Sequence, residues 1–288
     1  MDKNQLPSGS SNPLMKHFRQ PAIYYRLPSG GRFWNDDSLS LSATGELAVL
    51  PMTTRDEITL KTPDALMNGQ GVVDVIQSCV PSITNAWDTP SVDLDATLIA
   101  IRIASYGQQM DYDANCPSCN EENSYAIDLS RALEGIQMPD YDTPVVVSGL
   151  KIKLKPQKYF DRNNVSMLNF EEQQLLKVLS QASEMNPNDL KTQFDAHLQR
   201  LVDINIGLLT TSTEYIELED GTRVSDVDYL IEFYSNTDTR VIKAVQTRLA
   251  AIAEQADIPP QDVTCSNCGA KFGIGINFEY SSFFALGS

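Results

Sequence analysis

The pattern of hydrophobic and polar positions predicts a mixed fold that is mainly helical. Leu94, Leu98 and Ile101 recur at helical spacing, so we expect a nearly all-apolar helix over about 93–106. Gly107 follows it directly and is typical of a helix C-terminus. Because almost every side of this helix is apolar, it should lie at the centre of its domain.

The same periodicity predicts the other elements. Further helices are expected from about residue 54, over 70–79, and over 170–185, 188–209, 225–234 and 237–256. A short strand is expected at 46–50, and hairpins at 145–154 and 215–224, which turn at Ser148-Gly149 and Glu219-Asp220-Gly221. The predicted fold class is therefore α+β, mainly helical with short strands and hairpins.

Two residues depart from the apolar pattern of these helices. Arg102 stands in the central helix, where it should either extend its charge to water or pair with a carboxylate such as Asp95 or Asp56. Cys79 lies in the helical pattern of 70–79 and is interpreted as a buried apolar residue rather than a ligand.

The most specific motif consists of two Cys-x-x-Cys pairs far apart in the chain. They are Cys116 with Cys119 and Cys265 with Cys268. Each pair precedes strand-like alternation, which is the layout of a zinc ribbon. Four thiolates about 2.3 Å from a zinc ion form a closed structural site, with no open position for catalysis. The alternative is two unrelated thiol pairs or redox motifs, although a thioredoxin-like motif needs a strand followed by a helix. A disulfide within either pair would be strained.

Because a mostly helical segment separates the two pairs, the ribbon must be split, and the segment becomes an insertion closed at its base by metal. The predicted divisions are a flexible tail at 1–22, a mostly helical domain with a docking arm at 23–112, the split ribbon and hairpin at 113–156 and 258–280, the helical insertion at 157–257, and a C-terminal tail at 281–288.

Aromatic segments near both ends are candidate contact surfaces. The segment 23–34 has aromatic residues on either side of a Pro/Gly turn, and it can dock on a neighbouring chain or fold back over its own domain. The segment 280–284 is expected to dock on a partner surface, since exposed aromatic residues mark such contacts.

Charge narrows the choice of partners. The chain of 288 residues has 38 acidic and 22 basic side chains and a formal net charge of −16. This charge repels phosphate backbones, so no nucleic-acid partner is expected. No apolar run is long enough for a membrane span, and the N-terminal region has no apolar signal-peptide core. We expect the chain to be kept in a reducing compartment, which is consistent with thiolates reserved for a metal ion.

The search for catalytic residues finds none. The two histidines are His17, in the N-terminal region, and His197, in a predicted amphipathic helix where side-chain packing is its expected role. No nucleophile, phosphate-binding or dinucleotide-binding motif occurs in a fitting context. We therefore expect a protein that is not an enzyme and has no small-molecule substrate.

Four short blocks resemble a known family. LPSGGRFW at 27–34, LPMTTRDE at 50–57, IRIASYG at 101–107 and CPSC at 116–119 together resemble the T-even-type tailed-phage baseplate (hub) protein family, over roughly 23–129. The family's cysteine knuckle maps onto Cys116 and Cys119. The resemblance implies a structural part of a contractile-tail baseplate in the virion, at or near the hub, which contacts other baseplate and tail proteins in a symmetric assembly. It also implies that the protein is in the host cytoplasm during assembly.

Three other functions remain as alternatives. The first is a hub assembly chaperone or adaptor that is absent from the mature virion. A zinc-ribbon nucleic-acid factor is disfavoured by the acidic charge. A hydrolase is disfavoured because neither a nucleophile nor an open metal position is found.

Overall fold

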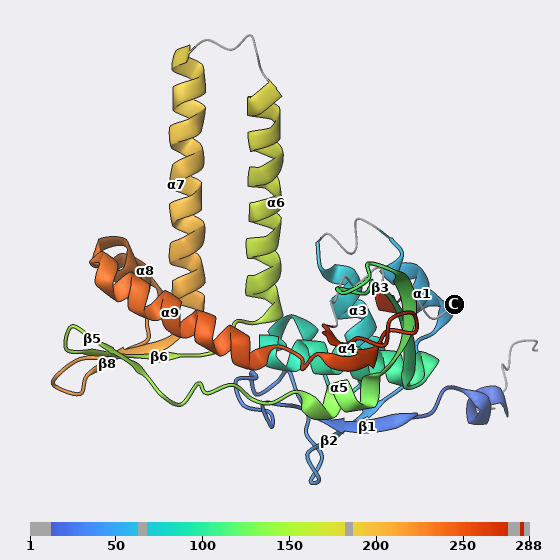
Figure 1. Ribbon diagram of the computed structural model, residues 1–288. Helices are drawn as coiled ribbons and strands as arrows, with labels where there is room; N and C mark the ends of the chain where they lie inside the picture. Colours follow the sequence, from blue (N-terminus) through green and yellow to red (C-terminus); the bar gives the residue numbers. More distant parts are fainter. Residues whose placement is uncertain (1–12, 63–67, 182–186, 276–282, 285–288) are drawn as a thin grey trace, which may run out of the picture.

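A long buried helix organises the first part of the molecule (Figure 1). The computed structural model describes residues 13–62, 68–181, 187–275 and 283–284. Helix α4 (Ser91–Tyr106) follows Pro90, and the N–H of Gly107, at φ 92°, donates to the carbonyl of Ile103 and ends it. Most of its side chains are buried, which confirms the predicted central helix. The elements before α4 are η1 (Pro13–His17), β1 (Ile23–Arg26), β2 (Glu46–Val49), α1 (Thr54–Leu60), α3 (Gln70–Cys79) and η2 (Ala86–Asp88).

The aromatic segment that includes β1 folds back over its own domain. Strand β1 pairs with β2, and the buried hydroxyl of Tyr25 hydrogen-bonds Thr97 of α4 at 2.8 Å. Beyond the strand, Asp93 of α4 accepts from the N–H of Ser29 and from the indole N–H of Trp34, both at 2.8 Å. Of the two alternatives left open by the sequence, the structure shows the covering role.

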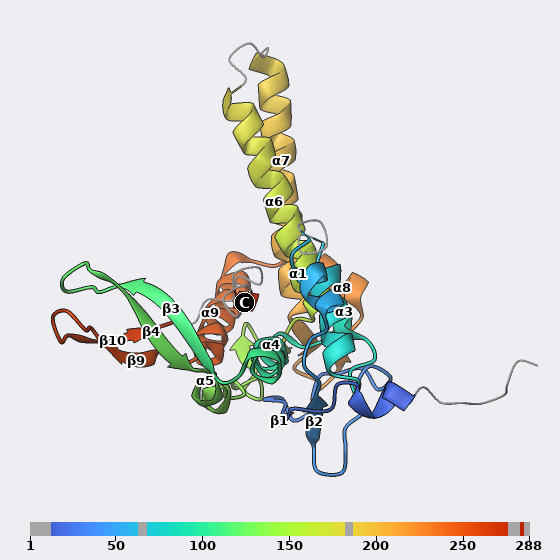
Figure 2. The same cartoon turned by 90° about the vertical axis from the view of Figure 1, so that its right-hand side faces the viewer.

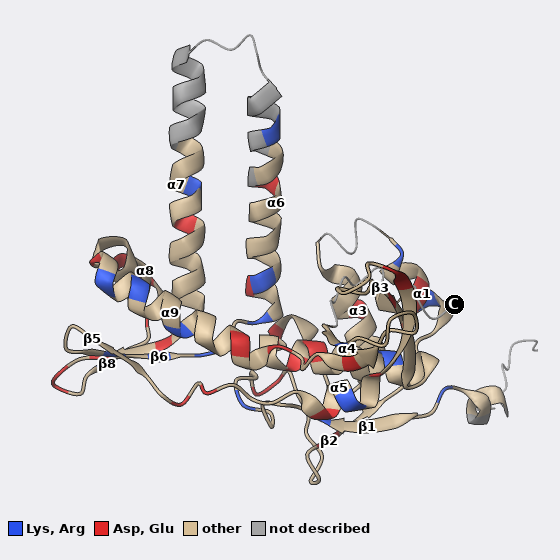
Figure 3. Ribbon diagram, in the orientation of Figure 1, with Lys and Arg blue, Asp and Glu red and all other residues tan. Residues whose placement is uncertain are grey.

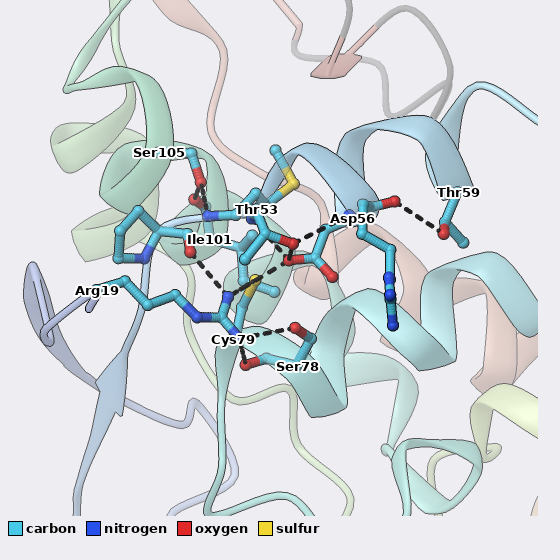
Figure 4. A network of polar contacts seen from close by, with 11 residues as sticks. Arg19, Thr53, Asp56, Thr59, Ser78, Cys79, Ile101 and Ser105 are labelled. Carbon is cyan, nitrogen blue, oxygen red and sulfur yellow. Dashed lines mark hydrogen bonds and ion pairs between the residues drawn. The ribbon is translucent and has the colours of Figure 1, made fainter. Parts of the chain in front are cut away.

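Arg19 fastens the segment before β1 to two helices (Figure 4). Its guanidinium donates to the carbonyl oxygens of Pro51 at 2.9 Å and Ser78 at 2.8 Å, and to the carboxylate of Asp56 at 3.3 Å. Asp56 is also part of the capping box that starts α1. The predicted flexible tail therefore contains an anchored residue, while residues 1–12 of it lie outside the described residues.

The prediction for Arg102 is wrong. Its side chain is 1% exposed, and among the described residues it has no carboxylate partner. Its Nη1 donates to the carbonyl of Phe283 at 2.6 Å, and its guanidinium lies 5.4 Å and 5.3 Å from the ring centroids of Tyr106 and Phe283. A carbonyl and two aromatic faces thus replace the expected carboxylate.

The C-terminal aromatic residues that the structure describes are packed inside the molecule. Phe283 and Phe284 are 2% and 5% exposed, and they belong to the hydrophobic core around α4. The expectation that they dock on a partner is wrong, because this core already covers them. The remaining residues of the predicted docking segment, 280–282, lie outside the described residues.

The segment between the cysteine pairs forms a second core on a small sheet. Strands β5 (Val145–Val147), β6 (Leu150–Leu154), β7 (Thr213–Glu217) and β8 (Arg223–Val224) pair antiparallel in this order. Ser148 and Gly149 connect β5 and β6 at φ 51° and 78°, the positive values that a tight hairpin turn needs, which confirms the first predicted hairpin. The pairing of β7 with β8 confirms the second. The sequence grouped the first hairpin with the ribbon, but β6 pairs with β7, which places it in this sheet.

Four stretches of helix complete this insertion: α6 (Tyr159–Gln181), α7 (Pro187–Thr211), α8 (Val227–Asn236) and α9 (Thr239–Ala256). Helices α8 and α9 pack on the second core, and α6 and α7 project away from it (Figures 1 and 2). Helix α6 begins well before the predicted residue 170. Its first residue, Tyr159, donates its N–H to Thr89 and stacks on Trp87 with ring centroids 5.5 Å apart. These contacts extend the helix through a polar stretch of low helix propensity.

The cysteine pairs lie on two further hairpins. They are formed by β3 (Gln109–Asn115) with β4 (Glu122–Asp128), followed by α5 (Leu129–Gly135), and by β9 (Gln261–Thr264) with β10 (Lys271–Ile274). The two hairpins lie together at one end of the molecule (Figure 2). We call these four strands the ribbon; its two halves come from either side of the insertion, as predicted.

Candidate metal centre

Each cysteine pair lies on a tight turn between antiparallel strands. In the first turn, the N–H of Cys116 donates to the carbonyl of Glu121 at 2.9 Å, and the N–H of Asn120 donates back to Cys116 at 2.8 Å. The second turn has the same two hydrogen bonds, the latter from Gly269 to Cys265. Asn120 and Gly269 occupy equivalent left-handed positions, at φ 58° and 72°. The two knuckles are therefore the same backbone structure, repeated.

The four sulfurs of the predicted site converge. The Sγ atoms of Cys116 and Cys268 are 3.7 Å apart, as are those of Cys119 and Cys265, and all four lie within 4.8 Å of one another. Four sulfurs arranged tetrahedrally about 2.3 Å from zinc are about 3.8 Å apart. A disulfide requires about 2.05 Å. The spacing therefore fits one shared metal ion better than bonded pairs, and thiolate is a donor that zinc prefers.

Hydrogen bonds and neighbouring sulfurs shift the pKa values of two of these thiols in opposite directions. The backbone N–H of Cys268, followed by that of Asn267, favours the thiolate of Cys265 and lowers its pKa to about 6. At Cys268 the N–H of Ala270 acts in the same direction, but the neighbouring sulfurs, Cys119 first, together raise the pKa to about 12. The opposite shifts belong to one coupled titration, since ionising one thiol opposes ionising the next. A dication at the centre removes this opposition.

One asparagine amide from each hairpin reaches a cysteine sulfur of the other hairpin. The Nδ2 of Asn123 lies 3.8 Å from the sulfur of Cys265, and the Nδ2 of Asn267 lies 3.8 Å from the sulfur of Cys119. The hydroxyl of Ser266 donates to the Oδ1 of Asn123 at 2.5 Å, which turns the amide donor toward the sulfur. The sequence did not single out these residues, because asparagine and serine are common in any turn.

Asn123→Ala is expected to weaken zinc binding by about 10- to 100-fold, the usual effect of removing a group that orients a metal ligand. Asn123→Asp should weaken it further, because it replaces a donor by a negative charge beside the thiolates. The affinity is measured by competition with a chromogenic chelator. Asn115→Ala, an exposed site at the end of β3, is the control. Equal affinity of Asn123→Ala and the control would contradict the assigned role.

The ribbon rests on the core around α4. The rings of Tyr125 from β4 and Phe272 from β10 meet edge to face with centroids 5.5 Å apart. Tyr125 and Ile274 are members of the core that surrounds α4. Both halves of the ribbon, which together hold the four cysteines, thus pack on the same hydrophobic core.

The other candidate residues lie apart from this cluster. Among the described residues, the four cysteines are the only group of three or more potential ligands that come together. Cys79 is fully buried as predicted, and burial raises the pKa of its thiol to about 12. His197 is buried on α7. No helix of the described ranges is both long enough and apolar enough to cross a bilayer.

Comparison with known proteins identifies a family. A family model described as T4 bacteriophage base plate protein matches residues 26–285. No curated protein and no solved structure matches the chain. The matched range contains both cysteine pairs and the whole insertion, whereas the resemblance seen in the sequence ended near residue 129. The chain belongs to the T4 bacteriophage base plate protein family.

Proposed function

We propose that this phage baseplate protein is a structural component at or near the hub of a contractile tail, and that a structural zinc ion stabilises it. The proposed ligands are Cys116, Cys119, Cys265 and Cys268. The zinc site is supported by the convergence of the four sulfurs, from cysteines 146 and 152 residues apart in the chain, and the baseplate role is supported by the family match. When bound there, zinc supplies cohesion between the two hairpins.

The arrangement supports a role in protein–protein contact rather than in catalysis. Four thiolates fill the coordination sphere of zinc, so no position remains for a water or substrate. The family is one of baseplate proteins, and the net charge of −16 disfavours nucleic acid. We therefore propose that its partners are other baseplate and tail proteins in a symmetric assembly, and that it has no small-molecule substrate.

Quantitative mass spectrometry and elemental analysis of purified virions test this function. We expect the chain at a fixed copy number in mature particles, with one zinc per copy, and in the hub fraction of dissociated baseplates. If the chain occurs in assembly intermediates but not in mature particles, the function is that of an assembly chaperone or adaptor. If it occurs only in peripheral baseplate fractions, the hub location is wrong.

A further inference from the structure

Helices α6 and α7 project together from the second core (Figure 1). They contain 23 and 25 residues, so each is about 35 Å long. A cavity of about 470 Å³ lies between the first half of α6 and the second half of α7. Val165 and Leu168 line it from α6, and Ile204 lines it from α7. These apolar residues face each other across a space that neither helix occupies.

Apolar side chains on this pair of helices are unusually exposed. Leu168 is 46% exposed although it lies on the face turned toward α7. Val165 on α6 and Ile204 on α7, which also line the cavity, are only half-buried. In a helical hairpin such residues are normally buried against the neighbouring helix. Their exposure indicates a surface that another protein covers.

Gly207 leaves space in the cavity for another backbone to come close to α7. It lies within α7 on the lining face, and a Cβ atom at this position would meet nothing within 4 Å. Glycine inside a helix lowers its stability, and one use of it is to let another backbone approach closely. No described part of this chain uses that space.

The charged residues that line the cavity indicate which kind of helix fits it. The lining contains the acidic residues Asp161, Glu171 and Asp203, and Arg200 as its basic residue. Charged side chains are otherwise sparse along the described part of the two helices (Figure 3). A second copy of the hairpin would bring the same acidic residues into the space and be repelled. A helix with an apolar stripe and basic flanks fits both the apolar and the acidic lining.

We propose that the space between α6 and α7 receives an amphipathic helix of another baseplate protein, whose apolar stripe is flanked by Lys or Arg. The recognition is that of a helix in a groove, with apolar anchors at helical spacing. The inference rests on the proposed function only in naming the partner as a baseplate protein. The binding test below does not depend on the composition of the virion, so this inference and the proposed function can fail separately.

The test uses the full chain and two fluorescent 18-residue helical peptides with the same Leu/Ala stripe. One has Lys on both flanks and the other has Glu, and binding is followed by fluorescence anisotropy. We expect the Lys peptide to bind at least ten-fold more tightly than the Glu peptide. The double variant Glu171→Lys/Asp203→Lys should reverse this preference. Glu232→Lys/Glu254→Lys, which makes the same charge change at exposed sites of α8 and α9, should preserve it.

Gly207→Leu separates docking from folding. Because the Cβ position is open and leucine favours helix, the variant should melt at the same or a higher temperature, yet bind the Lys peptide at least ten-fold more weakly. Equal binding of both peptides, or binding unchanged by Gly207→Leu, would overturn the proposal. Sedimentation showing a dimer that Gly207→Leu dissociates would also overturn it, since the occupant would then be a second copy.

Discussion

Cys265→Ser should release the zinc ion and destabilise both ends of the insertion together. Cys119 and Cys265 are 146 residues apart, and a cross-link that closes a loop of this length contributes about 5 kcal/mol in the chain-entropy model. Structural zinc binding in small domains is worth about 10–16 kcal/mol, and part of this appears as folding free energy. Because whole domains are stable by only about 5–15 kcal/mol, losing one ligand should be severe.

The measurements are zinc content by elemental analysis, the thermal midpoint, and limited proteolysis of the insertion. Cys79→Ala is the matched control, because Cys79 is a buried thiol outside the cluster. It should cost about 1 kcal/mol or slightly more through a small cavity and leave the zinc content unchanged. Full zinc content and unaltered protease resistance in Cys265→Ser would show that the four sulfurs do not share one ion.

Removing residues 283–288 is expected to destabilise the core around α4 by at least about 3–5 kcal/mol. The truncation deprives Arg102 of the carbonyl acceptor on Phe283 and of one of its two aromatic faces. Leaving a buried donor without its acceptor costs about 1–3 kcal/mol, and more for a charged group, and uncovering two phenylalanine sites adds about 1.5–3 kcal/mol for each. Denaturant unfolding of the purified chain measures the change.

A second substitution tests whether the unpartnered Arg102 causes this loss of stability. In the truncated chain, Arg102→Leu should restore part of the lost stability, because removing both members of a buried polar pair is far less costly than removing one. Removing only residues 285–288 retains both phenylalanines and is the control, with stability close to that of the full chain. Equal stability of the chain lacking 283–288 and the full chain would mean that Arg102 gains nothing from Phe283.

Local rules explain what could be predicted from the sequence. The two Cys-x-x-Cys spacings, the end of α4 at Gly107 and the turn at Ser148-Gly149 each depend on a few neighbouring residues. The helical spacing of apolar residues then predicts the positions of α3 and α4 correctly. The convergence of the cysteines was also predictable, because four ligands of one kind in two matching turns favour a single ion.

Contacts between distant residues explain what could not be predicted. The acceptor for Arg102 is a backbone carbonyl 181 residues away, which no side-chain pattern reveals. Helix α6 starts at Tyr159 because Thr89 and Trp87 hold its first turn, overriding weak local propensity. The amides that reach the sulfurs are likewise set by the meeting of two hairpins. Such features need the tertiary structure before they can be recognised.

The separation of the two ribbon halves has a consequence for synthesis on the ribosome. Cys116 and Cys119 are translated long before Cys265 and Cys268, and at 5–20 residues per second the interval is about 7–30 s. During this time the nascent chain offers half a ligand set, and the acceptor for Arg102 emerges later still. Chains that terminate early therefore have neither a complete thiolate set nor the carbonyl acceptor for the buried guanidinium of Arg102. We therefore expect closure of the fold to wait for the completion of translation.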